Sequence, residues 1–179
     1  MHRPRPRPTG VERTFDEDEI IVSKTDLTGK ITYANDVFLR VSGYAEHEIL
    51  GQPHSLIRHP EMPRAVFKLL WDTLGTGREI FAYVNNLACN GDNYWVLAHV
   101  TPSVGRDGRV VGYHSNRRVP DRAAVAVVDG LYAQLREEER RHADRATGLD
   151  RSAALLARAL ADRGLAYDEF VFSLAPQQV

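Results

Sequence analysis

Residues 51–63 read Gly51-Gln-Pro-His-Ser-Leu-Ile-Arg-His-Pro-Glu-Met-Pro63 and run directly into a segment with helical periodicity. Each proline fixes φ, removes a backbone donor and pushes the residue before it out of the helical region. The stretch is therefore predicted to be a stiff, irregular loop that holds its polar side chains in set positions. Pro63 suits the first position of a helix.

The segment after this loop is predicted to be an amphipathic helix that ends near Gly75. Phe67, Leu70, Trp71 and Leu74 recur at i, i+3, i+4 and i+7, so they share one helix face. A stiff polar loop that leads into this face could form the mouth of a site for a ligand with charged and apolar parts. A surface loop followed by an ordinary core helix would give the same pattern.

Strand patterns flank this loop and helix on both sides. Before them, two β-branched runs enclose the turn residues 25–29, and Asn35 is placed to cap a short helix over residues 36–42. After them, Asn90-Gly91 is a strong hairpin signal, and Pro102 is expected to end the pairing of the second strand. The strands are expected at 19–23, 30–33, 80–88, 92–101 and 109–118. The predicted fold class is α+β, a five-stranded antiparallel sheet with helices on one face.

Outside this central region, the two ends of the chain differ in character. Residues 1–15, in which arginine and proline alternate over residues 3–8, are expected to form a disordered, solvated arm. Residues 16–119 form the predicted domain, and residues 120–179 a C-terminal helical extension. Within the extension, Asp150 is expected to cap a helix, whereas the apolar segment 167–174 could be helix or strand.

The overall composition limits the classes of function. The formal charge of −1 gives no reason to expect a nucleic-acid partner, and a single cysteine, Cys89, excludes an intrachain disulfide. No apolar run approaches the roughly 20 residues of a membrane span, and the N-terminus lacks a secretory signal. A Walker A loop and a zinc-type His/Cys cluster are both missing from the sequence. We therefore expect a cytoplasmic protein without direct membrane insertion that is neither an enzyme nor a metal protein.

Several short segments resemble one family closely. They are Thr25-Asp-Leu27, Tyr33-Ala-Asn-Asp36, Val41-Ser-Gly-Tyr44, Gly51-Gln-Pro-His54, Arg58-His-Pro-Glu-Met-Pro63 and Asn90-Gly-Asp92 followed by Tyr94-Trp-Val96. Together they look like the FAD-binding PAS domain of bacterial aerotaxis and energy-taxis receptors, and the likeness runs from about residue 20 to 118. The resemblance implies a PAS fold. The receptors continue into a membrane anchor and a signalling coiled coil, so this chain looks more like the stand-alone PAS partner of a split receptor.

The resemblance also implies which residues bind FAD. In the family, the arginine, histidine and acid of the loop and the tryptophan of the next helix are needed for the cofactor. They correspond here to Arg58, His59, Glu61 and Trp71, and Glu61 stands where the family usually has aspartate. The resemblance gives His54, Asn35 and Asn86 as further cofactor-binding positions.

The chemistry of these residues fits a flavin dinucleotide. Arg58 suits the pyrophosphate, because a guanidinium is always charged and donates to phosphate in pairs. Phe67, Leu70 and Trp71 suit the apolar end of the ring. Strand alternation places Asn86 on one face with Ala82, Val84 and Ala88, where its amide would meet the pyrimidine edge. Surface salt bridges, core packing or solvent contacts remain alternative roles for each of these side chains.

We therefore expect a redox or oxygen sensor that binds FAD non-covalently and relays the flavin state to a partner. The expected partner is a membrane-bound chemotaxis-type receptor or another signalling protein, and the chain is expected to form a homodimer. Two alternatives remain open at this stage. One is a haem-binding PAS gas sensor that uses His54, His59, His99 or His114 as its axial ligand, and the other is a cofactor-free dimerisation or docking module.

Overall fold

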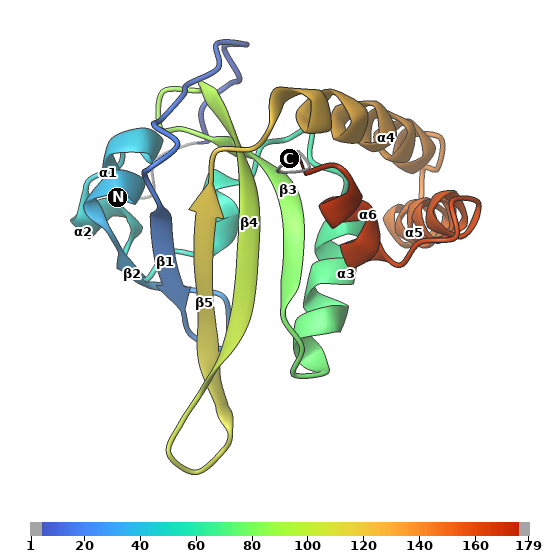
Figure 1. Cartoon of the computed structure of the whole chain (residues 1–179). Coiled ribbons are helices and arrows are strands. Elements are labelled where there is room, and N and C mark those ends of the chain that lie inside the picture. Colours follow the sequence, from blue (N-terminus) through green and yellow to red (C-terminus); the bar gives the residue numbers. More distant parts are fainter. Residues whose placement is uncertain (1–4, 176–179) are drawn as a thin grey trace.

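The computed structural model describes residues 5–175, and its centre is one antiparallel sheet (Figure 1). The strand order is β2-β1-β5-β4-β3, so the N-terminal hairpin pairs with the last strand. The five strands are β1 (Ile21–Thr25), β2 (Ile31–Ala34), β3 (Ile80–Leu87), β4 (Asn93–Val104) and β5 (Val110–Arg118). The predicted fold class, an α+β fold with five antiparallel strands, is confirmed.

Between β2 and β3 the chain crosses one face of the sheet in short helical segments. These are α1 (Asp36–Ser42), α2 (Glu46–Ile49), the 3-10 turn η1 (His54–Ile57) and α3 (Arg64–Gly75). Asn35 caps α1 through a bond from the Phe38 amide to its side-chain oxygen, and Gly43 ends α1 with a φ of 73°. The predicted cap and helix at this position are therefore confirmed.

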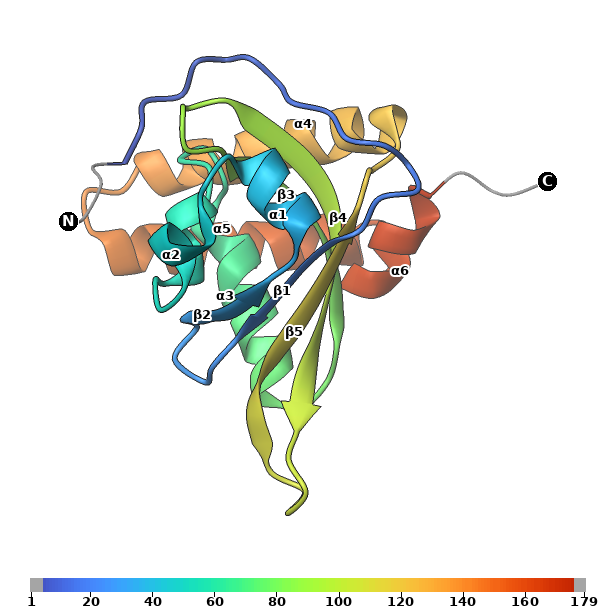
Figure 2. The ribbon, with the colours of Figure 1, turned by 90° about the vertical axis from the view of Figure 1, so that its left-hand side faces the viewer.

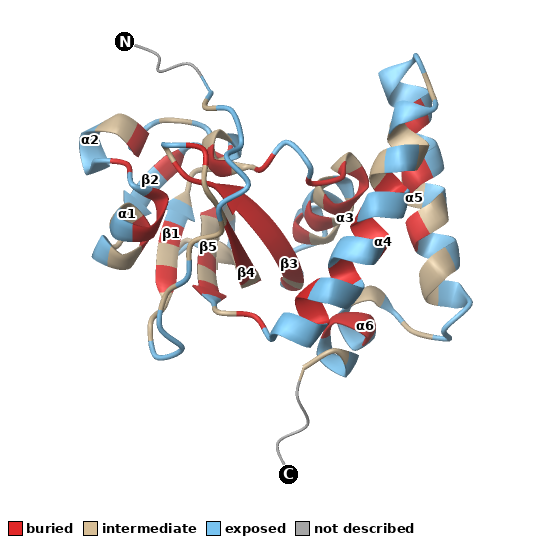
Figure 3. Cartoon of the chain, turned by 90° about the horizontal axis from the view of Figure 1, so that it is seen from above, coloured by how far each residue is buried: buried red, intermediate tan, exposed pale blue. Residues whose placement is uncertain are grey.

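Three further helices make up the C-terminal extension: α4 (Arg122–Arg140), α5 (Arg145–Ala161) and α6 (Tyr167–Ser173). The buried stripe of α4 packs beside β3 and β4 (Figure 3). There Tyr132 stacks near Trp95 and donates to the carbonyl of Tyr83 at 2.8 Å. Phe172 of α6 contacts Phe81 on the same face of the sheet. Helices α4 and α6 thus cover the face of β3 and β4 that is turned away from α3, whereas α5 packs against α3.

Two expectations for this part of the chain need correction. Helix α5 begins at Arg145 and is capped by Asp144, which accepts from the amide of Thr147, so Asp150 lies inside the helix. Pro102 does not end the pairing of β4, because it still pairs with Tyr113 of β5. Strand β3 begins at Ile80, opposite Val100, so one side of β4 is open at Pro102 and its missing donor leaves no neighbour unpaired.

The N-terminal arm differs from the expectation of a disordered leader over residues 1–15. Residues 9–13 run along the tip of the β3–β4 hairpin, with the amides of Thr9 and Arg13 donating to Gly91 and Asn93 at 2.8 and 2.7 Å (Figure 2). Arg13 also pairs with Asp92 at 3.0 Å. The tight turn leaves backbone groups unpaired, and the extended arm satisfies them. Residues 1–4 lie outside the described part.

Across residues 5–175, no helix combines the length and apolar character that a membrane span requires.

Candidate functional site

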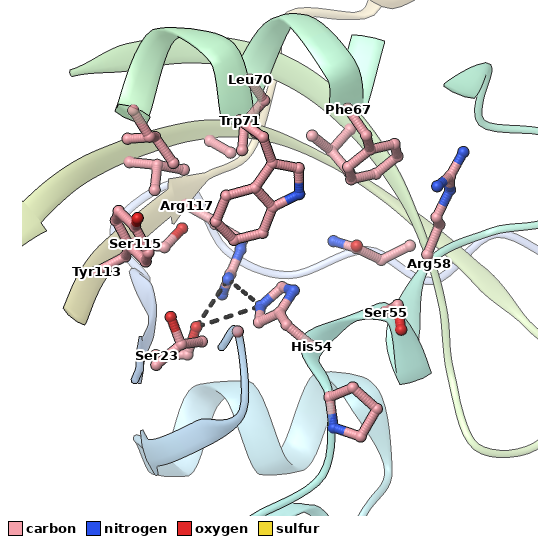
Figure 4. A pocket seen from close by; sticks show the side chains of 18 of the residues that line it. Ser23, His54, Ser55, Arg58, Phe67, Leu70, Trp71, Tyr113, Ser115 and Arg117 are labelled. Carbon is pink, nitrogen blue, oxygen red and sulfur yellow. Dashed lines mark hydrogen bonds between the residues drawn. The ribbon is translucent and has the colours of Figure 1, made fainter. Parts of the chain in front are cut away.

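A cavity of about 360 Å³ lies between the sheet and α3, a size that suits a small organic ligand (Figure 4). We call it the inner cavity. Its walls come from the inward faces of β1, β3, β4 and β5, from the segment 53–58 and from α3. The proline-rich loop therefore does what its sequence predicts, because it holds polar side chains against the apolar face of the following helix.

One wall of the inner cavity is apolar. Phe67, Leu70, Trp71 and Leu74, the predicted helix face, all line it, and Val84 faces them from β3. The Trp71 side chain stands at the mouth: it is 44% exposed and meets the ring of Tyr113 edge-on at 5.4 Å. An aromatic ring entering this space would therefore have an indole on its outer side.

The opposite wall carries a cluster of Ser23, His54 and Arg117 (Figure 4). Nη2 of Arg117 donates to Oγ of Ser23 at 2.7 Å and to Nε2 of His54 at 2.6 Å. Because a guanidinium only donates, Nε2 of His54 must be unprotonated. The imidazole is thus held in one orientation, with Nε2 as the acceptor.

Burial sets the charge states of this cluster. Desolvation, together with the positive charge of Arg117, lowers the pKa of His54 to about 3, so its imidazole is neutral near pH 7. Burial also lowers the pKa of Arg117, to about 10, which leaves the guanidinium charged. The inner cavity therefore contains a fixed positive charge, and no Asp or Glu is among the described residues that line it.

Three buried polar atoms around this cavity lack a hydrogen-bond partner within the described residues: Nδ2 of Asn86, Oγ of Ser115 and Nη1 of Arg117. Their residues are 2%, 8% and 3% exposed, and all three line the inner cavity. An unpaired buried polar group costs about 1–3 kcal/mol, and a charged one more. Two donors and a hydroxyl on one polar wall, opposite an apolar wall, match a flat heterocycle with carbonyl groups along one edge.

Arg58 lies at the end of the inner cavity, away from the Arg117 cluster (Figure 4). Its guanidinium stacks on Phe67 at 4.0 Å from the ring centre and donates to the carbonyl of Met62 at 3.0 Å. An isolated antiparallel β-bridge between the backbones of Arg58 and Asn86 joins this loop to the outer edge of β3. Burial, together with several nearby arginines and against the opposing effect of Glu139, lowers the pKa of Arg58 to about 10.

The structure brings four of the seven predicted cofactor-binding residues to the inner cavity: His54, Arg58, Trp71 and Asn86. Asn35 does not line it, because its side chain is used in the α1 cap and in bonds to the backbone of Val22 and Ile20. The other two, His59 and Glu61, also lie outside this cavity.

His59 is 5% exposed, and its ring accepts from the amide of Glu61 at 3.2 Å. The side chain of Glu61 is exposed, while its carbonyl accepts from Arg136. Their predicted contact with a cofactor has no counterpart in the inner cavity.

The other histidines considered as haem ligands lie away from the inner cavity. His99 stacks on Phe81 and pairs with Glu79 at 2.7 Å. His114 bonds to Asn116 at 3.0 Å, on the face of β5 opposite Ser115 and Arg117.

Ser23, Ser115 and Arg117 also line the inner cavity, but the sequence patterns did not identify them as candidate binding residues. A usable signal did exist, since Tyr113, Ser115 and Arg117 alternate along β5 and must share a face once that face is known. The strand pairing then places Ser23 opposite Ser115 on neighbouring strands.

Comparison with known proteins shows which fold family this architecture matches. Residues 31–117 match the family model described as the PAS fold. Over 119 residues, 66% of this chain, the sequence is 44% identical to the aerotaxis receptor of Escherichia coli (strain K12), of which the match covers 23%. It is also 29% identical to the nitrogen fixation regulatory protein of Klebsiella pneumoniae over 103 residues. That match covers 58% of this chain and 21% of the relative. The chain thus spans less than a quarter of the length of these relatives.

Solved structures agree on the fold. A light-oxygen-voltage domain studied with a flavin analogue superposes with a TM-score of 0.54 at 22% identity, covering 64% of this chain and 87% of that one. The light-state structure of the domain from the photoreceptor Aureochrome1 superposes with a TM-score of 0.52 at 23% identity. That match covers 68% of this chain and 92% of the other. Taken with the strand order and the inner cavity, these matches show that the chain contains a PAS domain, related in sequence to the aerotaxis receptor.

Proposed function

We propose that this protein is a redox sensor that binds FAD non-covalently, with the flavin ring in the inner cavity. The observation that carries the proposal is the set of three unpartnered buried groups, on Asn86, Ser115 and Arg117, that face an apolar wall across this cavity. The pyrimidine edge of a flavin has carbonyl oxygens and ring nitrogens, and its other end is a dimethylbenzene. The relationship to the aerotaxis receptor and the likeness to light-oxygen-voltage domains support the same choice of ligand.

In this proposal, residues of different chemistry bind different parts of the cofactor. Asn86 and Arg117 would donate to the pyrimidine edge, and Arg117 would there find the acceptor that its buried charge lacks. Phe67, Leu70 and Trp71 would cover the apolar end. Arg58, at the end of the cavity, would bind the pyrophosphate.

The signal would leave the site through β3. When bound, a flavin supplies a ring nitrogen that accepts a hydrogen bond while oxidised and donates one once reduced and protonated. The amide of Asn86 would then have to turn or lose its bond, which costs about 1–3 kcal/mol and shifts a two-state equilibrium by roughly five- to a hundredfold. Three residues earlier on β3, the carbonyl of Tyr83 accepts from Tyr132 of α4 at 2.8 Å, which gives a displacement of the strand a direct connection to the C-terminal helices.

The output would be read by another protein. We propose a cytoplasmic location, a homodimer and a membrane-bound chemotaxis-type receptor or similar signalling protein as the partner, by analogy with the receptor relative. In this proposal the chain is not itself an enzyme, since its role is to change shape with the redox state of its ligand.

The first test is the absorption spectrum of freshly purified protein, with the released chromophore identified. The expected result is a yellow protein that releases FAD, or an apoprotein that takes up FAD when it is supplied. A Soret band would instead show haem, and a protein that remains colourless with excess FAD would be a cofactor-free module. Either result would reject the proposal.

The relay is tested separately with Asn86→Ala. This variant should retain part of its FAD affinity but lose the redox-dependent change in amide hydrogen exchange of α4. Asn85→Ala is the matched control, because the side chain of Asn85 points to the other face of β3 and accepts from Asn93. A redox response of α4 that survives Asn86→Ala unchanged would show that this amide is not the relay.

A further inference from the structure

A second hollow, of about 500 Å³, adjoins the inner cavity. We call it the basic hollow. Its lining comes from the segment 55–64, the end of α4, the start of α5 and Arg5 of the N-terminal arm. Its lining contains arginines 5, 58, 64, 136, 140 and 145, with Glu139 as the single acidic residue among the described ones.

Most of this positive charge is not neutralised within the protein. Arg64 pairs with Glu139 at 3.0 Å, and Arg136 lies 3.5 Å from Asp129. For Arg140 and Arg145, no ion pair is found within residues 5–175, and both are exposed toward solvent. Six arginines around one concave surface with a single carboxylate leave it suited to an anion of more than one charge.

The wall that carries these arginines is fixed to the PAS domain. Arg64, at the start of α3, donates to Glu139 and to the carbonyl of Arg145 at 2.8 Å. Glu139 also accepts from the amide of Ala65 at 3.1 Å and so satisfies a free donor of the first turn of α3. Helices α4 and α5 approach closely beside this contact, since a Cβ added to Gly148 would lie 2.9 Å from the carbonyl of Glu139. The turn between α4 and α5 is therefore held in place beside the loop.

The two hollows share Ser55 and Arg58. A flavin whose ring fills the inner cavity would thus pass Arg58 with its ribityl chain and enter the basic hollow with the group attached to the end of that chain. In FAD that group is the pyrophosphate, which carries two negative charges, followed by adenosine. Riboflavin ends before this point, and FMN brings only one phosphate.

We propose that the C-terminal extension completes the cofactor site: Arg140 and Arg145 bind the pyrophosphate together with Arg58, and they make the protein selective for the dinucleotide. The inference rests on the proposed flavin function and adds to it a role for helices outside the PAS domain. Guanidinium groups suit this task because each can donate two parallel bonds to phosphate oxygens.

The test compares three flavins on the full chain. FAD, FMN and riboflavin are titrated into wild-type apoprotein and into Arg140→Gln/Arg145→Gln, with flavin fluorescence as the readout. In the double variant the dissociation constant for FAD should rise at least about tenfold, because bonds to charged groups are lost. The constant for riboflavin should stay within about twofold, because riboflavin has no phosphate for these arginines to bind.

The matched control is Arg151→Gln/Arg158→Gln, which removes the same charge from exposed positions of α5 that do not line the basic hollow. Near-UV circular dichroism and melting curves check that all variants fold. Arg140→Lys/Arg145→Lys keeps the charge but not the paired donors, and should give an intermediate affinity for FAD.

Five outcomes would overturn the inference. If wild-type protein binds FAD and riboflavin equally, or if the double variant keeps its FAD affinity, the extension plays no part and the flavin function stands. If the double variant loses affinity for FAD and for riboflavin by the same factor, the substitutions act on the binding of the flavin ring and not on that of the pyrophosphate. If the control variant binds FAD as weakly as the double variant, the effect comes from the net charge of the protein and not from these two positions. Wild-type protein that binds none of the three flavins would reject the proposed function itself, and this inference with it.

Discussion

Nη2 of Arg117 lies 2.6 Å from Nε2 of His54, so a buried cation is held against a neutral imidazole where a carboxylate would be the usual partner. The hydroxyl of Ser23, the face of Phe38, whose ring centre is 5.6 Å from the guanidinium carbon, and the nearby Tyr94 add to this contact. A buried charge compensated by neutral groups alone costs stability, and such a cost is typical of a site built for a ligand. This relationship gives the first two predictions.

Replacing Arg117 with methionine should separate stability from binding. We expect the unfolding free energy of the apoprotein to stay the same or to rise by about 1 kcal/mol or more, because a desolvated charge is removed from the interior. Flavin affinity should fall. Denaturant unfolding and flavin titration measure the two effects, and Arg118→Met, at an exposed neighbouring position of β5, is the control. A large loss of apoprotein stability in Arg117→Met would show that the guanidinium is structural.

The imidazole of His54 should make the apoprotein less stable in mild acid. Its pKa is about 3 in the folded state, well below the ordinary value of 6.5, so between these pH values the unfolded chain binds a proton that the folded protein does not. Stability is unaffected above pH 6.5 and falls as the pH drops toward 3, by up to about 1.4 kcal/mol per pH unit.

The comparison that isolates this effect is His54→Gln, whose side chain can still accept from Arg117 but does not titrate. Denaturant unfolding between pH 7 and 4 should show a slope that is smaller in the variant by nearly one proton. Parallel curves for the two proteins would mean that His54 is protonated normally in the fold.

The hydroxyl of Tyr132 should stabilise the contact between α4 and the edge strand β3. It donates to the carbonyl of Tyr83 at 2.8 Å and is buried, with Tyr132 1% exposed. Tyr132→Phe should lower the unfolding free energy by about 1–2 kcal/mol, because the carbonyl loses its partner away from water. Urea unfolding measures this change, and flavin affinity should remain the same. An unchanged midpoint would indicate that water replaces the hydroxyl.

Two helix glycines should respond to alanine with opposite signs. Gly148 lies where α5 meets α4, and an added Cβ would be 2.9 Å from the backbone carbonyl of Glu139 and 3.2 Å from the guanidinium of Arg64. Gly148→Ala should therefore destabilise the protein by about 1–3 kcal/mol through overpacking. Gly130, in α4, has no atom within 4 Å of such a Cβ, so Gly130→Ala should stabilise by about 0.5–1 kcal/mol through helix propensity.

Thermal melting of the two glycine variants beside wild type is sufficient to check this pair. Two shifts in the same direction would contradict the close packing of α5 on α4.

Local sequence patterns determined much of the fold and one half of the candidate site. Strand alternation placed Asn86 with Val84 on the inward face, and helical spacing placed Phe67, Leu70 and Trp71 on one wall, as the structure confirms. These features follow from periods of two and of 3.6 residues, which depend only on neighbouring residues.

The tertiary structure decided the other half. Arg117 meets His54 and Ser23 across 63 and 94 residues of sequence. The pairing of β1 with β5 brings Ser23 beside Arg117, and the 3-10 turn η1 brings His54 to the same cluster. Likewise, Arg140 and Arg145 belong to a run of charged residues in the sequence. Only the docking of α4 and α5 on α3 places them around the same hollow as Arg58. Long-range register and helix docking depend on the whole core, so no local pattern could reveal which buried groups would be left without partners.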